Sequence, residues 1–449
     1  MKVLLVSTNT VAEPHPSYPI GLDYVMNAIS PPHQVKTVDM NELGDGSALA
    51  DVLSQFVPDV IGLSIRNIDN VDFANVQIFI GQIRELISMI RMQSRGLIIL
   101  GGSGFTIMPG ELMTLLEADY GIIGEGERLQ LLLKALERNE NISGLSGIVT
   151  KDSLIEFPKP WPQPFPRGVF PNNSYTTFYL ERGGILNLQT KRGCPFNCVY
   201  CTYPHIEGKR FRFVKPEEVA DTARILQDAG ARYIYVTDST LNGNYEHSME
   251  VAAAFKKAGI SIPWGGLFVP TTPPHDYYGI LADAGLTHVE FGTEALSNRV
   301  LEAYGKPFHI YDVFSSHREA LAAGLHVAHY LMLGGPGENE DTLKETLVNT
   351  DKLEKTAFFV FSGIRIYPHT ALYTLALEEG HMESNWNPLE PRFYWSPAVQ
   401  REAVMELVKN HAASRANWVI GTGSQLMFKN IAKLYARGRV GPLWERLIR

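Results

Sequence analysis

The stretch Cys194-Pro-Phe-Asn-Cys198-Val-Tyr-Cys201 contains all three cysteines of this 449-residue chain. An odd, tightly clustered set cannot form a disulfide framework, so we expect these thiols to bind a metal or to take part in catalysis. Three thiolates on one loop can hold three irons of a [4Fe-4S] cluster and leave the fourth iron open. Spacing alone leaves two alternatives: a Cys3His zinc site that includes His205, and three unrelated buried cysteines.

The cysteine loop follows the apolar run 185–190 (ILNLQT), the first of six strand-like runs that alternate with helical patterns up to about residue 380. This alternation predicts a partial (β/α)6 barrel of parallel strands. A loop that leaves the carboxyl end of a barrel strand lies on the face that binds ligands. The other five runs are 233–238, 262–268, 288–292, 326–333 and 359–366.

The first 150 residues show a second alternation. Short apolar runs separated by helical patterns predict a doubly wound parallel sheet of the flavodoxin-like (Rossmann) type. The predicted strands are 2–7, 34–39, 60–64, 97–101 and 120–124, and the predicted helices are 21–29, 71–92 and 110–118. Ligands of such sheets bind beyond the carboxyl ends of the strands, where three distinctive loops lie: 64–70 (SIRNIDN), 101–105 (GGSGF) and 124–127 (GEGE).

A run of six prolines over 158–171 separates the two alternating regions and predicts a stiff, extended connector. We therefore expect four segments: 1–150, a connector over 151–184, the barrel over 185–380, and a small, mostly helical C-terminal region over 381–449. The last region is rich in aromatic residues, which either line a substrate pocket or form a packed satellite core, the commoner outcome. They are Trp386, Phe393, Tyr394 and Trp395.

Composition excludes several classes of protein. A hydrophobic fraction of 45% supplies ample core, and a net charge of −8 argues against a dedicated nucleic-acid binder. The sequence has no apolar run of about 18 residues, so no membrane span is expected. The N-terminus reads as a first strand and not as a signal peptide, and clustered free thiols indicate a reducing, cytoplasmic location.

The cysteine spacing, with Tyr200 before the last cysteine, resembles the radical S-adenosylmethionine (SAM) superfamily. The resemblance covers roughly residues 185–380 and includes 334–338 (GGPGE), which is similar to the family's strand-five turn. It implies a [4Fe-4S] cluster on Cys194, Cys198 and Cys201, whose open iron binds SAM. The second strand ends in Thr-Asp-Ser where the family has Gly-Gly-Glu. The residues that the resemblance places against SAM are Tyr200, Thr237, Asp238, Ser239, Glu294 and Arg365.

A flavodoxin-like domain before such a barrel resembles the cobalamin-dependent (class B) members. The Asp-x-His-x-x-Gly motif that supplies a lower cobalt ligand is absent, so the resemblance implies base-off binding without a histidine ligand. Arg66 either faces the cofactor or pairs with Asp39 or Asp69. The glycine-rich loop is alternatively an ordinary tight turn, and 124–127 alternatively a helix cap. The candidate cobalamin-binding residues are Ser64, Arg66, Asn67, Gly101, Gly102, Gly104, Phe105, Gly124 and Glu125.

The resemblance implies a C-methyltransferase that uses SAM as radical source and methylcobalamin as methyl donor, acting on an unactivated carbon of a small molecule. The alternative is a ring-forming, ring-contracting or rearrangement reaction; a non-enzymatic sensor would not need the barrel. An external one-electron reductant such as flavodoxin or ferredoxin is implied. No catalytic residue is assigned. On the fifth strand His326 and His329 point to opposite faces, and Tyr330 shares the face of His326.

Overall fold

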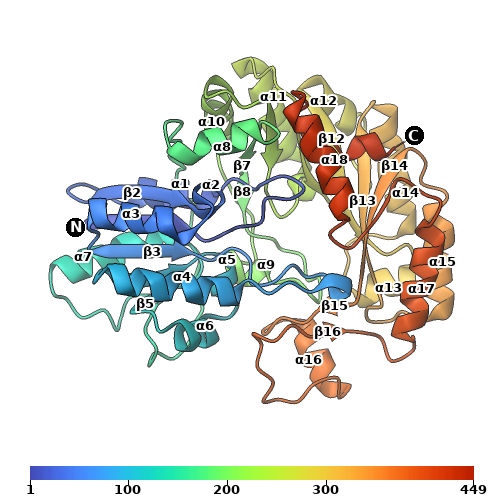
Figure 1. Cartoon of the computed structure of the whole chain (residues 1–449). Helices are drawn as coiled ribbons and strands as arrows, with labels where there is room; N and C mark the ends of the chain where they lie inside the picture. The colour runs from blue at the N-terminus through green and yellow to red at the C-terminus, as the bar shows by residue number, and fades with distance from the viewer. Residues whose placement is uncertain (449) are drawn as a thin grey trace.

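The computed structural model describes residues 1–448, which form two α/β lobes side by side (Figure 1). The N-terminal lobe is built on one sheet of strand order β2-β1-β3-β4-β5-β6. All neighbouring strands are parallel except β5 and β6. The strands are β1 (Lys2–Ser7), β2 (Gln34–Asp39), β3 (Val60–Ser64), β4 (Leu97–Gly101), β5 (Tyr120–Ile122) and β6 (Ile148–Val149).

Helices cover both faces of this sheet because its apolar strands must be buried on both sides. One face packs against α3 (Gly46–Phe56), α4 (Ile80–Gln93) and α6 (Pro109–Leu116). The other face packs against α1 (Ile20–Ala28) and α7 (Leu129–Glu137). The order confirms the doubly wound prediction and places a topological switch point between β1 and β3, where such sheets bind ligands. The short helices are α2 (Met40–Leu43), α5 (Ser103–Ile107) and the 3-10 turn η2 (Gly126–Arg128).

The predicted helix over 71–92 is wrong in its first nine residues. Only a 3-10 turn, η1 (Phe73–Asn75), precedes α4. Side chains compete there for the backbone: Asn70 accepts from the N–H of Gln77, and Asp72 accepts from that of Ala74. Val71 also has a left-handed φ of 52°, which a helix does not allow.

The second lobe is the barrel, a seven-stranded parallel sheet of order β17-β14-β13-β12-β11-β10-β7. Six of its strands follow the predicted runs. The seventh, β17 (Trp418–Ile420), comes from the region predicted to be mostly helical and pairs with β14. The six are β7 (Ile185–Leu188), β10 (Tyr233–Val236), β11 (Trp264–Phe268), β12 (Leu286–Glu294), β13 (His326–Leu333) and β14 (Thr356–Ser362).

Helices follow the barrel strands and cover the outside of the sheet. They are α10 (Pro216–Asp228), α11 (Tyr245–Ala258), α12 (Tyr277–Asp283), α13 (Asn298–Ala303), α14 (Ile310–Ala322) and α15 (Glu340–Thr350). Further short elements are α8 (Ser174–Glu181), α9 (Tyr203–Ile206), η3 (Leu241–Gly243), α16 (Ala371–Glu378), α17 (Arg401–Ala412), α18 (Gln425–Ala436), η4 (Trp444–Leu447) and the ribbons β8 (Lys191–Arg192) with β9 (Arg212–Phe213) and β15 (Ile364–Arg365) with β16 (Phe393–Tyr394).

The proline-rich run has no helix or strand and crosses the N-terminal lobe. The Arg128 guanidinium donates to the carbonyl of Lys159, and Arg167 pairs with Asp23 at 2.7 Å. Arg167 also donates to the carbonyl of Asn187 on β7, so the end of the run is tied to the barrel. Helix α8 lies inside the span 151–184 and makes this part more than a connector.

The four C-terminal aromatics belong to a hydrophobic cluster and not to a cavity wall. Trp395 and Tyr394 are buried, and Trp386 is nearly so. Phe393 and Trp395 both contact Phe73 of the N-terminal lobe edge to face. The commoner outcome, a packed core, therefore holds, and part of that core joins the lobes.

Candidate active site between the lobes

The cysteine loop begins at β8, directly beyond the carboxyl end of β7. Cys194 is buried, whereas Cys198 and Cys201 are half-buried and free. The N–H of Val199 donates to the carbonyl of Tyr304, which ties the loop to the turn after α13. Gly305 in that turn has a φ of 68°, and a Cβ there would lie 2.6 Å from the Asn197 oxygen. This close approach requires glycine.

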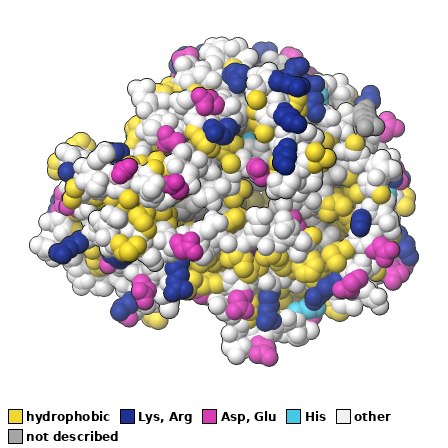
Figure 2. Space-filling view, in the orientation of Figure 1, with side chains coloured by type: hydrophobic (Ala, Val, Ile, Leu, Met, Phe, Trp, Pro, Cys, Tyr) yellow, Lys and Arg dark blue, Asp and Glu magenta, His cyan; other side chains and the backbone are white. Residues whose placement is uncertain are grey.

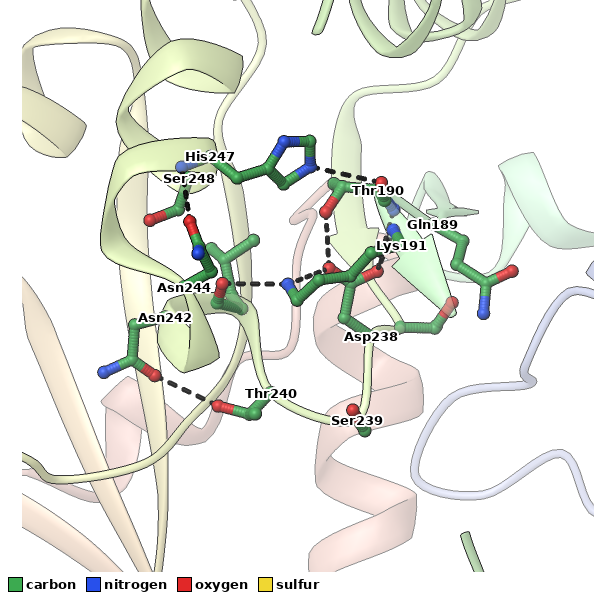
Figure 3. A network of polar contacts seen from close by, with 12 residues as sticks. Gln189, Thr190, Lys191, Asp238, Ser239, Thr240, Asn242, Asn244, His247 and Ser248 are labelled. Carbon is green, nitrogen blue, oxygen red and sulfur yellow. Dashed lines mark hydrogen bonds and ion pairs between the residues drawn. The ribbon is translucent and has the colours of Figure 1, made fainter. Parts of the chain in front are cut away.

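Asp238, predicted to bind SAM, forms its ion pair and its hydrogen bonds within the protein. Its side chain is fully buried; it pairs with Lys191 Nζ at 2.7 Å and accepts from the N–H and hydroxyl of Thr190 (Figure 3). In this structure the carboxylate therefore fixes the strand that enters the cysteine loop, and its contact with SAM stays a prediction. Ser239 donates to the carbonyl of Gly193 and acts on the same loop.

Glu294 and Tyr200 contact each other beside the cysteines, as two residues predicted to bind the same SAM molecule should. The Tyr200 hydroxyl donates to Glu294 Oε1 at 2.9 Å, and Lys306 Nζ lies 2.8 Å from the same oxygen. Burial by itself lowers the pKa of Lys306, but Glu294 and Cys198 raise it above its usual value. Lys306 is the residue that sequence reasoning missed here, because a single lysine after α13 carries no motif.

Arg365, another of the predicted SAM contacts, also forms its hydrogen bonds and its ion pair within the protein. Its Nε lies 2.8 Å from Asp69 Oδ2, and the guanidinium donates to the carbonyls of Ile366 and Pro388. Both partners of the ion pair are almost completely buried. This side chain joins the barrel to the loop after β3, and its contact with SAM stays a prediction.

A cavity of about 520 Å³ lies between the lobes; we call it the inter-lobe cavity. Figure 2 shows a recess at the centre of the face where the lobes meet. Most of the candidate cobalamin residues line the cavity, and so do residues beside the cysteine loop. The former are Ser64, Arg66, Asn67, Gly101, Gly102, Gly124 and Glu125; the latter are Gln189, Arg192, Tyr203, Ile206, Glu207 and Thr237.

Two candidates do not line this cavity. Phe105 is completely buried in the core of the N-terminal lobe, against Gly121, so its assignment to cobalamin is wrong. Gly104 lies at a smaller adjoining cavity of about 300 Å³. Gly102 has a φ of 96°, and a Cβ there would lie 2.5 Å from the Ile65 oxygen, so the loop needs glycine for its own packing.

Arg66 projects into the inter-lobe cavity and has no carboxylate partner among the described residues. Both alternatives weighed for it fail: Asp69 pairs with Arg365, and Asp39 accepts from Tyr179 and Asn41. Its enclosure lowers the pKa of the guanidinium, although an arginine stays protonated in proteins. An arginine at a cavity wall that has no carboxylate partner is a candidate ligand-binding residue.

Glu125 and Glu127 join the lobes. Arg192 lies 2.9 Å from Glu125 and 2.6 Å from Glu127, and Arg212 lies 2.8 Å from Glu125. All four side chains are largely buried, so the loop after β5 is held against β8 and β9. The Glu125 side chain therefore caps no helix. Its carboxylate pairs with Arg192 and Arg212 and so positions the loop.

The donor set fits an iron–sulfur cluster better than zinc. Burial raises the pKa of Cys198, and that of Cys201 to about 12, with the neighbouring thiols adding to both. A bound cationic cluster would supply the positive charge that these thiolates lack. His205, the proposed zinc ligand, instead packs against Phe157 and His369. In residues 1–448 no three His, Cys, Asp or Glu side chains, the cysteines included, already converge on one point, so the preference for a cluster rests on the thiol donors and on the position of His205.

Family models match the two lobes separately. Residues 8–133 match the family model of the B12 binding domain, and residues 188–348 match that of the radical SAM superfamily. The fold and the site therefore define a two-domain radical SAM protein with a B12-binding domain. The chain therefore carries a B12 binding domain followed by a radical SAM domain, the two domains expected of a cobalamin-dependent radical SAM enzyme.

Several relatives cover most of the chain. An uncharacterised methyltransferase of Pyrococcus horikoshii is 27% identical over 82% of this chain and 80% of its own length. Cytidylyl-2-hydroxyethylphosphonate methyltransferase of Streptomyces wedmorensis is 24% identical over 80% and 78%. The solved structure of the radical SAM methyltransferase TsrM from Kitasatospora setae, with cobalamin and a [4Fe-4S] cluster, superposes with a TM-score of 0.86 at 20% identity, covering 99% and 97%.

Proposed function

We propose that this enzyme is a C-methyltransferase that modifies an unactivated carbon of a small molecule. One observation carries the proposal: the same cavity is lined by loops of the B12-binding lobe and by residues that flank the cysteine loop. Both cofactors would then act on one substrate. The relatives named as methyltransferases, and the tryptophan substrate of TsrM, support the reaction and the substrate class.

The residues that would hold the cluster are Cys194, Cys198 and Cys201, with Tyr200 and Glu294 beside its open side. When bound, the cluster with SAM would supply a carbon radical and cobalamin a methyl group. The protein's own groups bind, orient and exclude water. Thr237, which lines the inter-lobe cavity, and Ser239, which donates to the carbonyl of Gly193, stay proposed SAM contacts.

Cobalamin would lie against Ser64, Arg66, Asn67 and the glycines of the loops after β4 and β5. We propose that it would bind base-off and without a histidine ligand, and that Arg66 would contact it without coordination, because a guanidinium cannot give a lone pair to cobalt. His15 borders the adjoining barrel cavity, and burial together with Arg66 lowers its pKa to about 4, so a neutral imidazole is present there. Electron paramagnetic resonance of bound cob(II)alamin tests this: a histidine-nitrogen splitting would contradict the missing ligand.

The methyltransferase assignment is tested with SAM that carries a deuterated methyl group. We expect the reduced holoenzyme to transfer the label to bound cobalamin and, with its substrate, to the product. Unlabelled product together with 5′-deoxyadenosine would establish a rearrangement or cyclisation instead. In the Cys194/Cys198/Cys201→Ala variant we expect iron and the visible charge-transfer band to be lost; zinc in the parent protein would end the radical assignment.

A reductant such as flavodoxin or ferredoxin and a cytoplasmic location complete the proposal. Both rest on the radical chemistry and on the reduced thiols. Among residues 1–448, no helix is long and apolar enough to cross a membrane.

A further inference from the structure

A second cavity, of about 720 Å³, occupies the inside of the barrel; we call it the barrel chamber. Helix α18 and the 3-10 turn η4 form the wall that the curved sheet leaves open, through apolar residues such as Leu434 and Leu447. Each of the first six barrel strands contributes at least one residue to the chamber; these residues include Ile185, Tyr235, Leu267, Glu290, Tyr330 and Phe359.

Glu290 is an exception among the mostly apolar residues that line the chamber. Its Oε2 accepts from the hydroxyls of Tyr235 at 2.9 Å and Tyr330 at 3.1 Å, and its Oε1 accepts from Trp444 Nε1 at 3.0 Å. In residues 1–448 no lysine or arginine lies within ion-pair distance of it. All three partners are neutral, so the carboxylate is buried without a counter-ion.

A carboxylate offers about four lone-pair sites, and three of these are filled. The open position is on Oε1. Burial raises the pKa of Glu290, and the three hydrogen bonds and His288 oppose that rise. A cationic donor that enters the chamber could therefore pair with the Glu290 carboxylate, which has no counter-ion in the protein.

The other charged groups of the chamber are not placed to compete. Glu13 is exposed at the mouth, and Arg446 is more than half exposed with its Nε 3.3 Å from Glu445. His288 lies 3.3 Å from the same Glu445. Arg66 stands where the chamber meets the inter-lobe cavity, since both cavities are lined by it.

We propose that the barrel chamber binds the substrate as a largely apolar small molecule with one amine, and that the amine donates to Oε1 of Glu290. This deepens the proposed function and rests on it. The chamber and the inter-lobe cavity share Ser17, Arg66, Asn187 and Thr237. The end of the molecule remote from the amine therefore faces the cofactors, so the carbon that is modified lies away from the nitrogen.

Three probes of one shape test the ligand class: 4-phenylbutylamine, 4-phenylbutanol and 4-phenylbutanoate. They are titrated calorimetrically into holoenzyme loaded with cobalamin and cluster. We expect the amine to bind at least tenfold more tightly than the alcohol and the carboxylate. Equal affinities, or tightest binding of the carboxylate, would overturn the proposal.

Glu290→Gln should remove the preference for the amine, whereas the matched control Glu340→Gln, on the exposed surface of α15, should keep it. An amine preference that survives in Glu290→Gln would overturn the proposal. Should Glu290→Gln fail to fold, Trp444→Phe decides, because it frees a further acceptor position on Oε1. We then expect a larger amine preference, and a loss of preference contradicts the proposal.

The proposed function has a separate readout in the same preparations. Iron and cobalamin contents, and transfer of deuterated methyl from SAM to cobalamin, need no substrate. If label transfer fails while the amine preference is present, the methyltransferase assignment falls and the ligand class stands. If label transfer succeeds and the probes bind equally, only the inference on Glu290 falls.

Discussion

Lys191 and Asp238 form an ion pair that solvent does not reach, directly before the cysteine loop. The Lys191 ammonium also donates to the carbonyl of Leu241, and the Asp238 carboxylate holds the backbone of Thr190. The ammonium therefore has two hydrogen-bond partners, and both oxygens of the carboxylate accept hydrogen bonds. Desolvating two charges is tolerable only under this condition, because an unpaired buried charge is strongly destabilising.

We expect Asp238→Asn to destabilise the barrel by about 3–5 kcal/mol, since it leaves the Lys191 ammonium buried without its counter-charge. Chemical denaturation of the reconstituted protein measures this cost. Lys191→Met/Asp238→Asn should recover most of it, because both charges are then gone. A single variant as stable as the parent would show that water enters this site.

Arg66, in contrast, has no carboxylate partner among residues 1–448. We expect Arg66→Lys to keep cobalamin binding, because the glycine loops that line the cavity are unchanged. The shorter, more compact ammonium should alter the rate of label transfer from SAM to cobalamin by about tenfold or more, given how poorly lysine replaces a planar guanidinium. Visible spectra and single-turnover label transfer measure both quantities. Identical spectra and rates would make Arg66 structural.

At the scale of elements, α14 and β13 meet through two buried histidines. His317 Nδ1 lies 3.0 Å from His329 Nε2, and His329 Nδ1 lies 2.7 Å from the hydroxyl of Thr293. His329 is on the outer face of β13, whereas Tyr330 points into the barrel chamber, as the alternation of a strand predicts. Burial lowers the pKa of His317 to about 4.

This pair should make the barrel sensitive to acid. The unfolded chain takes up a proton at the ordinary histidine pKa of about 6.5, whereas folded His317 does so only near 4, so stability falls as the pH drops between these values. At pH 5 the loss from this residue is about 2 kcal/mol. We expect His317→Gln to flatten the change in urea midpoint between pH 7.5 and pH 5.

The exposed His275→Gln is the matched control for that measurement and should leave the pH dependence of the midpoint as it is in the parent protein. A His317→Gln profile that runs parallel to the parent profile would mean that other groups set the acid sensitivity.

Elements differ in how far the sequence predicts them, and the reason is physical. β13 follows its predicted run because a run of eight residues that is apolar except for His326 and His329 fits a buried parallel strand. β17 has only three residues and pairs with a strand about sixty residues away, so no local pattern reveals it. The cysteines were predictable because their spacing is local. The Arg365–Asp69 pair was not predictable, because it joins positions 296 residues apart.

The same distinction, between a local pattern and a contact of distant positions, separates Glu290 from the Arg192–Glu127 pair. A single acid in an otherwise apolar predicted strand, at a position that alternation places beside His288, is a signal that sequence reasoning could have used. The Arg192–Glu127 pair gives no such signal, because neither residue belongs to a pattern until the lobes are brought together.

At the scale of the whole molecule, buried polar contacts hold the two lobes in one arrangement. Arg192, two residues before Cys194, pairs with Glu125 and Glu127 of the B12-binding lobe. On the other side Arg365 pairs with Asp69. Both contacts involve loops that border the cavities, so these ion pairs hold the cysteine loop and the barrel against the loops after β3 and β5.

We expect Glu127→Gln to loosen this arrangement, because Arg192 then keeps only the more shared carboxylate of Glu125. Amide hydrogen exchange over residues 191–214 should accelerate on the order of tenfold, which corresponds to about 1.4 kcal/mol of local opening. Asp221→Asn, which breaks the exposed Asp221–Arg224 pair on α10, is the control and should change exchange hardly at all. Because the opened segment contains the cysteine loop, cluster content should fall in Glu127→Gln even though no cysteine is altered. Unchanged exchange in 191–214 would mean that the hydrophobic contacts of Phe73 with Phe393 and Trp395 suffice to fix the lobes.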